Sequence, residues 1–177
     1  HEIGRPFELI IVNDGSIDAT LSRLIALSAK TPELRVIDLF RNFGVMAAVT
    51  GGIAQAKGEA IIVMDGDLQD PPETIGSMVD KWVDGADTVV GERISRKEGI
   101  ILQLLISVYY WIYGKLNNTS DGVSVGNFGL MDKRLARIMM GMPERQRYFS
   151  GLRDWIGGRQ ESVSYHRAAR EYGETRQ

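Results

Sequence analysis

The chain has 177 residues, of which 44% are hydrophobic and 25% charged, and this composition is ordinary for one globular domain. Its formal net charge is −2, so overall charge gives no argument for nucleic acid binding, and we expect no nucleic-acid partner. The absence of cysteine excludes disulfides, thiolate metal sites and a cysteine nucleophile, and it is consistent with a reducing compartment.

The first third of the chain alternates short apolar segments with amphipathic ones. Strands are predicted at 8–12, 34–39 and 60–64, and helices at 18–27 and 45–57. Ser16 or Asp18 is the candidate N-cap of the first helix, and Gly58 is the candidate C′ residue of the second. Because the connections are short, the order β-α-β-α-β implies a parallel sheet with right-handed crossovers.

A third helix, with an apolar stripe from Ile75 to Val83, follows a Pro-Pro pair and ends at Gly85. A fourth strand is predicted at 86–90, and a polar loop follows it. Further along, we predict a strand at 128–131, helices at 133–140 and 145–157, an edge strand or hairpin arm at 160–166, and ten poorly ordered residues at the end.

Residues 100–113 form the most apolar run, but its length of about 14 residues is short of the roughly 20 that cross a bilayer. Two interpretations stay open for it. It is either a core helix or a helix that lies in the membrane interface, as Tyr109, Tyr110, Trp111 and Tyr113 would favour.

The segment from Ile61 to Glu73 is the centre of the functional argument. An apolar strand, predicted to be buried, ends at Asp65-Gly66-Asp67, and carboxylates at the carboxyl end of a strand in an α/β sheet lie where ligands bind. Two carboxylates this close repel each other unless a cation lies between them, and a divalent metal with oxygen ligands is the simplest candidate. The segment therefore predicts a nucleotide-sugar and metal site, with a solvated turn as the alternative.

Positive charge accumulates toward the C-terminus. From Asp132 onward the chain has ten basic and six acidic residues, although the whole chain is net negative. This excess is either a solvated face or a surface for phosphate groups and anionic lipid headgroups, which arginine recognises well.

Several separated motifs occur in order along the chain. They are Asn13-Asp14-Gly15-Ser16 with Asp18, Arg41-Asn42-Phe43-Gly44, the segment Asp65 to Glu73, Gly91-Glu92-Arg93, Pro143 to Arg147, Gly151-Leu152 and Gly157-Gly158-Arg159-Gln160. Together they resemble the inverting family 2 glycosyltransferases, in the branch of dolichol-phosphate mannose synthase and bacterial polyprenyl-phosphate glycosyltransferases. The resemblance covers nearly the whole chain.

The resemblance implies an α/β GT-A fold, in which helices flank a Rossmann-like, mostly parallel sheet. It implies a single catalytic domain over 1–177, with a nucleotide-binding half at about 1–93 and an acceptor half at about 94–177. Family members begin with one more strand and often continue into a membrane segment, so we expect this chain to be a truncated form of that fold.

The resemblance also implies an activity, which is metal-dependent transfer of a sugar from a UDP- or GDP-sugar to a polyprenyl phosphate such as undecaprenyl or dolichyl phosphate. The implied cofactor is Mg²⁺ or Mn²⁺. The implied location is the cytoplasmic face of a membrane, with the membrane surface as a partner and a homo-oligomer as a further possibility.

On the donor side, Asp65 and Asp67 resemble the family's metal-binding Asp-x-Asp, with Gln69 as a third ligand or a water-mediated contact. A cation held there would neutralise the charge that develops on the diphosphate leaving group. Asp14 resembles the aspartate that contacts the nucleotide, with an N-cap as its alternative role.

Two neighbouring motifs complete the predicted nucleotide site. Asn13 stands where the family often has a second acid, so it keeps an acceptor but carries no charge. Arg41 could reach the base or the phosphates, with an ordinary surface arginine as the alternative.

On the acceptor side, Arg93 resembles the arginine that pairs with the acceptor phosphate, and Ser107 matches a serine near the same phosphate. Two positions depart from the family pattern. Gln103 replaces a usual arginine, and Asn127 replaces the aspartate of Gly-Asp-Phe-Arg-Leu-Met-Asp. A phosphate acceptor is already an anion, so it needs positioning more than deprotonation, and Asn127 could still orient the donor sugar.

These departures leave two alternative functions open. One is a family 2 glycosyltransferase with another acceptor, such as a polysaccharide or glycan. The other is a degenerate, non-catalytic domain that only binds nucleotide-sugar or helps a membrane complex to assemble.

Overall fold

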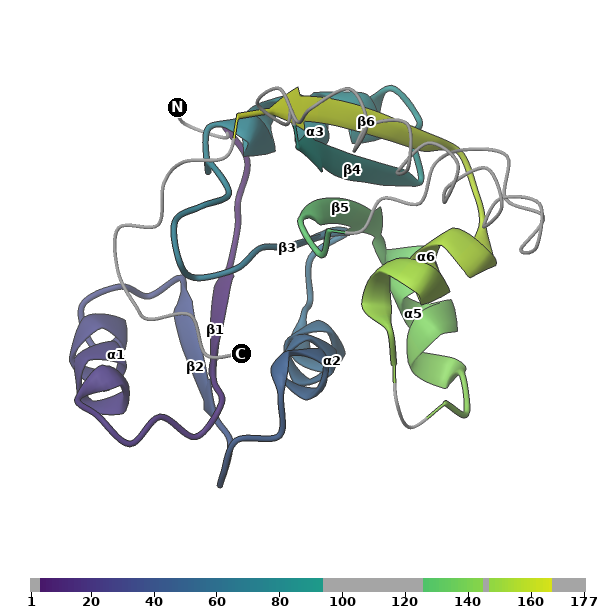
Figure 1. The fold of residues 1–177 in the computed structure, drawn as a ribbon. Helices are drawn as coiled ribbons and strands as arrows, with labels where there is room; N and C mark the ends of the chain where they lie inside the picture. The colour runs from purple at the N-terminus through teal and green to yellow at the C-terminus, as the bar shows by residue number, and fades with distance from the viewer. Residues whose placement is uncertain (1–3, 94–125, 145–146, 167–177) are drawn as a thin grey trace, which may run out of the picture.

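A computed structural model describes residues 4–93, 126–144 and 147–166 of the chain, as an α/β arrangement of two sheets and their helices (Figure 1). The elements appear in an order close to the predicted one. They are β1 (Leu9–Asn13), α1 (Thr20–Ser28), β2 (Leu34–Asp38), α2 (Val45–Gln55), β3 (Ala60–Val63), α3 (Thr74–Val83), β4 (Thr88–Arg93), β5 (Gly129–Asp132), α5 (Lys133–Gly141), α6 (Phe149–Ile156) and β6 (Gln160–Tyr165).

The first sheet consists of β1 and β2, which pair in parallel with Asn13 opposite Asp38. The parallel pairing predicted for these two strands is confirmed. Because parallel strands end at the same edge, the polar turns that follow β1 and β2 lie next to each other. α2 follows and packs against β1, where Gly52 approaches the side chain of Val12.

The second sheet has four described strands in the order β3-β5-β4-β6. β5 lies antiparallel between β3 and β4, and β6 pairs in parallel with β4. The predicted run of parallel strands therefore stops at β2, because β3 takes β5 as its hydrogen-bonded neighbour. β6 lies at one edge of these four strands, so of the two predictions for residues 160–166, an edge strand or a hairpin arm, the edge strand is confirmed.

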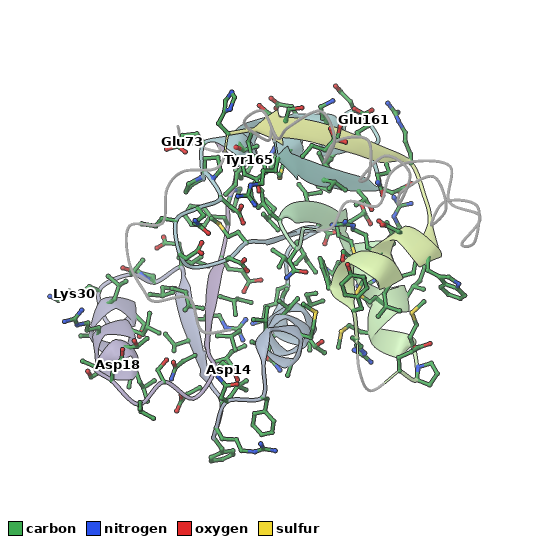
Figure 2. The ribbon with its side chains drawn as sticks, in the orientation of Figure 1. Asp14, Asp18, Lys30, Glu73, Glu161 and Tyr165 are labelled. Carbon is green, nitrogen blue, oxygen red and sulfur yellow. The ribbon has the colours of Figure 1, made fainter. Side chains whose placement is uncertain are left out.

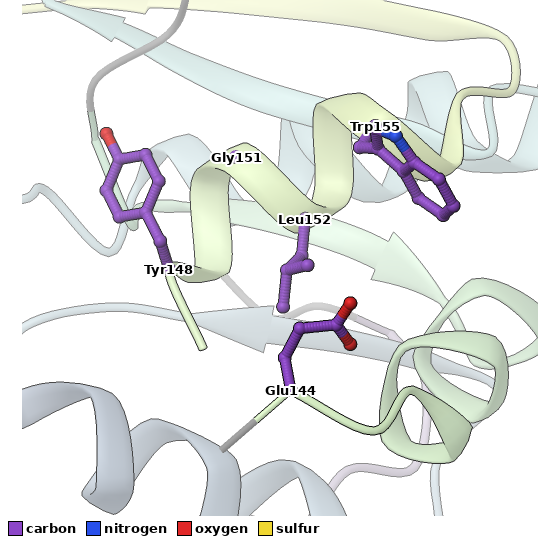
Figure 3. A pocket seen from close by; sticks show the side chains of 5 residues that line it. All are labelled: Glu144, Tyr148, Gly151, Leu152 and Trp155. Atoms are coloured by element: carbon purple, nitrogen blue, oxygen red, sulfur yellow. The ribbon is translucent and has the colours of Figure 1, made fainter. Parts of the chain in front are cut away.

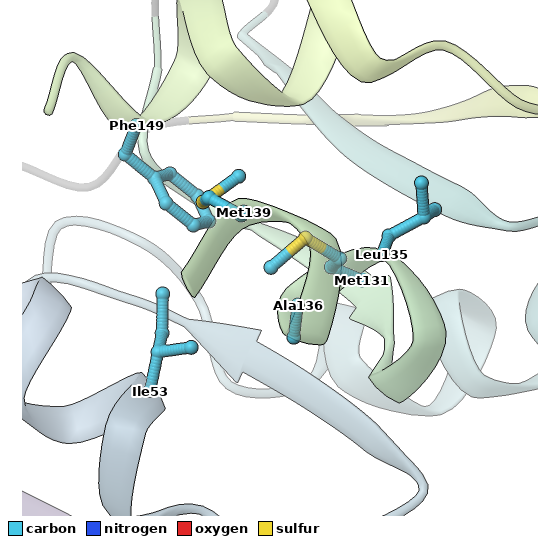
Figure 4. Packing of buried hydrophobic residues seen from close by; sticks show 6 residues of the cluster. All are labelled: Ile53, Met131, Leu135, Ala136, Met139 and Phe149. Carbon is cyan, nitrogen blue, oxygen red and sulfur yellow. The ribbon is translucent and has the colours of Figure 1, made fainter. Parts of the chain in front are cut away.

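Apolar side chains form two clusters on opposite faces of the second sheet. One joins Ile53 of α2 and Met131 of β5 to α5 and α6, where Leu135, Met139 and Phe149 are buried (Figure 4). The other lies under α3 and contains Met78, Val89, Phe128 and Leu130. These two clusters fix the sheet between α3 on one side and α5 with α6 on the other.

Several predictions about burial and boundaries need correction. β1 and β3 were expected to be buried, but most of their residues are only half-buried, and no residue of α1 is buried. β3 has a hydrogen-bonded neighbour along one edge among the described strands, which leaves its side chains less covered than those of β4. The fourth strand continues to Arg93 instead of ending before the Gly-Glu-Arg motif.

Helix ends also differ from the sequence prediction in places. α2 ends at Gln55 with an extended residue after it, so Gly58 is not its C′ glycine. The last helix begins at Phe149, later than predicted. The N-cap residue of α1 is Ala19, so neither Ser16 nor Asp18 is its N-cap as predicted, although Asp18 accepts a hydrogen bond from the backbone N–H of Thr20, the first residue of the helix, at 3.0 Å. Gly85, with φ of 98°, ends α3 as predicted.

In the described part of the chain, no helix has the length and apolar character needed to cross a membrane. The apolar run at 100–113, the polar loop before it, and the last residues of the chain lie outside the described residues.

Candidate active site

Asn13 and Asp38 join the ends of β1 and β2. The Asn13 amide donates from Nδ2 to Asp38 Oδ1 at 2.7 Å, and its Oδ1 accepts from the Ser16 backbone N–H at 3.4 Å. Asn13 is only 4% exposed. Its amide thus holds the turn after β1. An ionised acid at this position has no donor for the carboxylate of Asp38 and would repel it.

Asp14 ties this turn to the start of α2. Its two carboxylate oxygens accept hydrogen bonds from the backbone N–H groups of Phe43 at 2.7 Å and Gly44 at 2.9 Å. Gly44 is the N-cap residue of α2, so Asp14 fixes the turn that leads into that helix. The predicted alternative role of Asp14 as an N-cap is wrong, because the N-cap residues of α1 and α2 are Ala19 and Gly44. Each oxygen keeps a further lone pair for a ligand.

Gly15 allows the two turns to approach each other. It has φ of 67°, and a Cβ on it would lie 2.4 Å from the Arg41 carbonyl carbon. Arg41 itself is exposed, and its guanidinium lies 4.3 Å from the centre of the Phe43 ring. The structure thus brings Asp14 and Arg41 to the same edge, as the sequence motifs predict.

The Asp-x-Asp loop leaves β3 with Asp65 exposed and Asp67 half-buried. Asp67 Oδ1 accepts a hydrogen bond from the Gln69 backbone N–H at 3.1 Å, across Leu68, whose φ is 58°. A positive φ at a leucine is strained, and such strain is concentrated at functional sites. This turn fixes the direction of the Asp67 carboxylate and places the half-buried Gln69 beside it.

Tyr165 anchors the far end of this loop. Its hydroxyl donates to Asp70 Oδ1 at 2.6 Å, and Asp70 is only 6% exposed. The contact joins the end of β6 to the loop after β3, and Figure 2 shows Tyr165 close to Glu73, which follows that loop. Sequence reasoning missed both residues, because 95 positions separate them and neither the strand pattern nor the loop composition indicates the pairing.

The Tyr165 ring also contacts the segment that carries Asn127. It packs edge-on against the Phe128 ring, with centroids 5.2 Å apart and an angle of 86° between the ring planes. Arg93, the exposed last residue of β4, is the register partner of Tyr165. Tyr165 therefore links Asp70 of the Asp-x-Asp loop, Arg93 and the half-buried Asn127 segment at one end of the second sheet.

A glycine makes this junction possible. A Cβ on Gly91 would lie 2.5 Å from Phe128 Cδ1 and 3.0 Å from Tyr165 Cε1. The Gly91 backbone N–H also donates to the Phe128 carbonyl at 3.0 Å. The glycine of the Gly-Glu-Arg motif thus lets two aromatic rings pack directly over β4.

Asp14 and Asp67 are each held by hydrogen bonds of their own. Asp14 accepts from the backbone of Phe43 and Gly44, and Asp67 accepts from the backbone of Gln69. In Figure 2, Asp14 lies at the lower end of the view near α2, whereas Glu73 and Tyr165 lie at the upper end. Ser107 and Gln103, which the sequence assigns to the acceptor phosphate, lie outside the described residues.

Two ion pairs, Asp132 with Arg134 and Arg153 with Asp154, lie next to the second sheet. Burial acts to raise the pKa of Asp132, but hydrogen bonds from the Arg134 guanidinium and the Trp82 indole outweigh it and hold the pKa below its usual range. Burial lowers the pKa of the Arg153 guanidinium on α6 and raises the pKa of Asp154 beside it. None of these residues was predicted as functional.

The described residues contain no group of three or more His, Cys, Asp or Glu side chains that could hold a metal ion. Asp65 and Asp67 nevertheless fit Mg²⁺ or Mn²⁺ that is shared with a substrate. Mg²⁺ in particular is usually bound by one or two carboxylates plus substrate phosphates and water. The donor set is all oxygen, and the turn at Leu68 orients one of the two carboxylates.

A shallow hollow of about 310 Å³ lies on α6 and the residues before it. It is lined by Glu144, Tyr148, Gly151, Leu152 and Trp155, and Figure 3 shows the Trp155 ring at its rim. None of the predicted site residues lines it. We therefore place the candidate site at the strand ends and not in this hollow.

Comparisons with known proteins identify the family of the chain. Residues 2–133 match Glycosyl transferase family 2. An uncharacterized glycosyltransferase of Synechocystis sp. is 39% identical over 171 residues, which cover 96% of this chain and 54% of that protein. A prophage bactoprenol glucosyl transferase homolog of Escherichia coli is 37% identical over 170 residues, which cover 96% of this chain and 56% of that protein. The chain thus spans about half the length of these relatives.

A solved structure shows the same fold. Glucosyl-3-phosphoglycerate synthase from Mycobacterium tuberculosis, in complex with Mn²⁺ and UDP-glucose, matches with a TM-score of 0.62 at 19% identity, covering 94% of this chain and 61% of that one. The predicted GT-A fold is confirmed. Because the family match at residues 2–133 covers well over half of the sequence, the chain belongs to glycosyl transferase family 2.

Proposed function

We propose that the protein transfers a sugar from a UDP- or GDP-sugar to a polyprenyl phosphate, with inversion at the anomeric carbon. The observation that carries this proposal is the junction at Tyr165, where the Asp-x-Asp loop, Arg93 and the Asn127 segment are tied together. A metal-carboxylate group and an arginine side by side suit a reaction between a diphosphate and a phosphate.

Two comparisons support the choice of substrates. One relative is named a bactoprenol glucosyl transferase homolog, and bactoprenol is a polyprenol. The M. tuberculosis synthase with the same fold was solved with Mn²⁺ and UDP-glucose. We infer that the donor here is a nucleotide-sugar and that the cofactor is Mg²⁺ or Mn²⁺.

We assign a role to each site residue from its position. Asp65 and Asp67, with Gln69 beside them, would hold the cation, which neutralises charge on the nucleoside diphosphate as it leaves. Arg93 would pair with the acceptor phosphate, whose oxygen forms the new bond to the anomeric carbon as the bond to the diphosphate breaks. The acceptor is already ionised, so no proton has to be removed, and asparagine at 127 is compatible with the reaction.

We place Asn13, Asp14 and Arg41 on the nucleotide side, where Asp14 holds the turn before α2 and keeps lone pairs for a ligand. Ser107 remains our proposal for a further contact to the acceptor phosphate. A lipid acceptor places the reaction at a membrane surface. We propose the cytoplasmic face, where nucleotide-sugars are available, and the basic excess after Asp132 would favour anionic headgroups there.

The test uses the full-length protein with Mn²⁺ or Mg²⁺, a panel of UDP- and GDP-sugars and a polyprenyl phosphate, and it measures glycolipid formation. We expect one donor to give product, and we expect Asp67→Ala to abolish metal-dependent turnover. Asp80→Ala, an exposed aspartate on α3, is the matched control and should leave turnover unchanged. Normal nucleotide binding without product from any donor would favour the alternative of a non-catalytic domain. Transfer only to a glycan would favour the alternative of a family 2 glycosyltransferase with another acceptor.

A further inference from the structure

Arg153 is a buried cation with unused hydrogen-bond donors. It lies on α6 with 2% of its surface exposed. Its Nε makes one long hydrogen bond, of 3.4 Å, to Asp154 Oδ1. Both Nη atoms are buried and have no hydrogen-bond partner among the described residues. Burying donors of a charged group without partners is costly, so their presence calls for an explanation.

The guanidinium points toward the start of β5. Its Nη1 lies 3.3 Å from the place that a Cβ on Gly129 would occupy. Gly129 pairs with Val63 of β3 and Val90 of β4. Asp65 follows Val63 by two residues, which in an extended chain is about 7 Å. The buried charge therefore lies close behind the edge from which Asp65, Arg93 and Asn127 emerge.

The surroundings of Arg153 are polar without being satisfied. Ser150, one turn earlier on α6, and Thr88 of β4 have buried hydroxyls with no partner among the described residues. Thr88 faces the same side of the sheet as Val90, next to Gly129, because side chains alternate along a strand. The neighbouring α6 residues Phe149 and Leu152 belong to the apolar cluster, and the Arg153 guanidinium carbon lies 5.8 Å from the centre of the Phe149 ring, which offers no oxygen to the Nη atoms. An interface that served packing alone would have no need of these groups.

The ion pair with Asp154 is one-sided. Asp154 contacts the Nε side of the guanidinium, whereas the Nη side faces Gly129. The pair is therefore an oriented dipole whose positive end is directed at the strand ends. In a buried setting such a fixed dipole acts over several ångströms, because little water is present to screen it.

We propose that Arg153 is a positioning residue that supplies a fixed positive potential at this edge of the sheet. This potential favours the anionic diphosphate of a nucleotide donor and opposes cation binding to the Asp-x-Asp loop when no nucleotide is present. The inference rests on the donor assignment made under the proposed function. It explains why a charge with two unpartnered Nη groups is kept inside the protein, since replacing a buried ion pair by apolar side chains commonly preserves or improves stability.

The test compares Arg153→Met, which keeps the length and removes the charge, with Arg153→Lys, which keeps the charge, and with Asp154→Asn, which removes the negative end of the dipole. Calorimetry on the full-length protein measures UDP and GDP affinity in the presence of Mn²⁺. Electron paramagnetic resonance measures the affinity for Mn²⁺ alone, and thermal denaturation measures stability.

For Arg153→Met we expect nucleoside diphosphate affinity to fall by roughly 3- to 10-fold and Mn²⁺ affinity to rise by a similar factor, as for loss of one partly screened charge nearby. The melting temperature should not fall. Arg153→Lys should retain most of both affinities, and Asp154→Asn should shift both in the direction opposite to Arg153→Met. A purely structural role of Arg153 would not lower the nucleoside diphosphate affinity and raise the Mn²⁺ affinity in the same variant.

Unchanged affinities in Arg153→Met, or a joint loss of both affinities together with a lower melting temperature, would overturn the inference. A wild-type protein that binds neither UDP nor GDP would overturn it along with the donor assignment. Binding without sugar transfer would remove only the proposed function, because none of these three measurements requires turnover.

Discussion

Replacing Tyr165 by phenylalanine removes one hydroxyl and leaves the edge-on contact with Phe128 in place. The hydroxyl donates to Asp70 at 2.6 Å, and Asp70 is 6% exposed, so water can replace the lost donor only poorly. Hydrogen bonds to charged groups contribute about 1.5–3 kcal/mol, and we expect the free energy of unfolding to fall by an amount in that range. For a domain of this size each kcal/mol lowers the melting temperature by about 2–4 °C.

Denaturant titration of the full-length protein measures this loss. Tyr148→Phe is the matched control, because Tyr148 is half exposed and makes no hydrogen bond through its hydroxyl to a described residue. Since Asp70 closes the loop that begins at Asp65, Tyr165→Phe should also raise the Mn²⁺ concentration needed for half-maximal turnover. Equal stability of Tyr165→Phe and Tyr148→Phe would refute the idea that this contact anchors the loop.

Two further predictions concern residues that hold the sheets together. Gly15→Ala should lower the free energy of unfolding by more than about 2 kcal/mol, because it places a Cβ at positive φ and against the Arg41 backbone. Arg134 and Trp82 hold the folded pKa of Asp132 below the usual value for an aspartate, against the effect of burial. The contribution of this carboxylate to stability is therefore present above that usual value and is lost as the pH falls through the folded pKa. The stability difference between wild type and Asp132→Asn should therefore be constant near neutral pH and shrink below about pH 4 in acid titrations.

For each of these two predictions, one experimental outcome would contradict it. Gly51, in α2, has open space around its Cβ position, so Gly51→Ala should be neutral or stabilising, and a Gly15→Ala variant that behaves like it would show that the turns do not need glycine. A stability difference for Asp132→Asn that stays the same down to pH 3 would show that the paired carboxylate is not its source.

Local sequence patterns predicted most elements but not how the second sheet is joined. The strand before Asp65 is visible as a continuous apolar run, although its residues are half-buried, and α3 is visible because its apolar residues recur with the helical period. The place of β5 between β3 and β4 is not visible, because that pairing depends on contacts with residues far away in the chain. The half-buried state of β3 follows from the same pairing and was missed with it.

In the candidate site, too, local features were predicted from the sequence and long-range contacts were not. Asp65, Asp67 and Gln69 were found because they follow a strand directly, and their loop closes on itself through a local hydrogen bond. The contact of Asp14 with the turn before α2 and the anchoring of Asp70 by Tyr165 were not predicted, since they join residues 30 and 95 positions apart. Arg153 was counted only as part of a basic excess, and nothing in its local sequence indicates that it is buried.

The order of strands in the second sheet has a consequence for how the chain is made. β4 pairs with β5 and β6, and both of these partners come later in the chain than β4 itself. On the ribosome, β3 and β4 would therefore emerge with unpaired backbone N–H and C=O groups along their edges, and among the described strands neither has a hydrogen-bonding partner until residues 129–132 follow. Such late, long-range closure slows folding and extends the time during which nascent strands can aggregate, so we expect synthesis of this protein to depend on holdase chaperones.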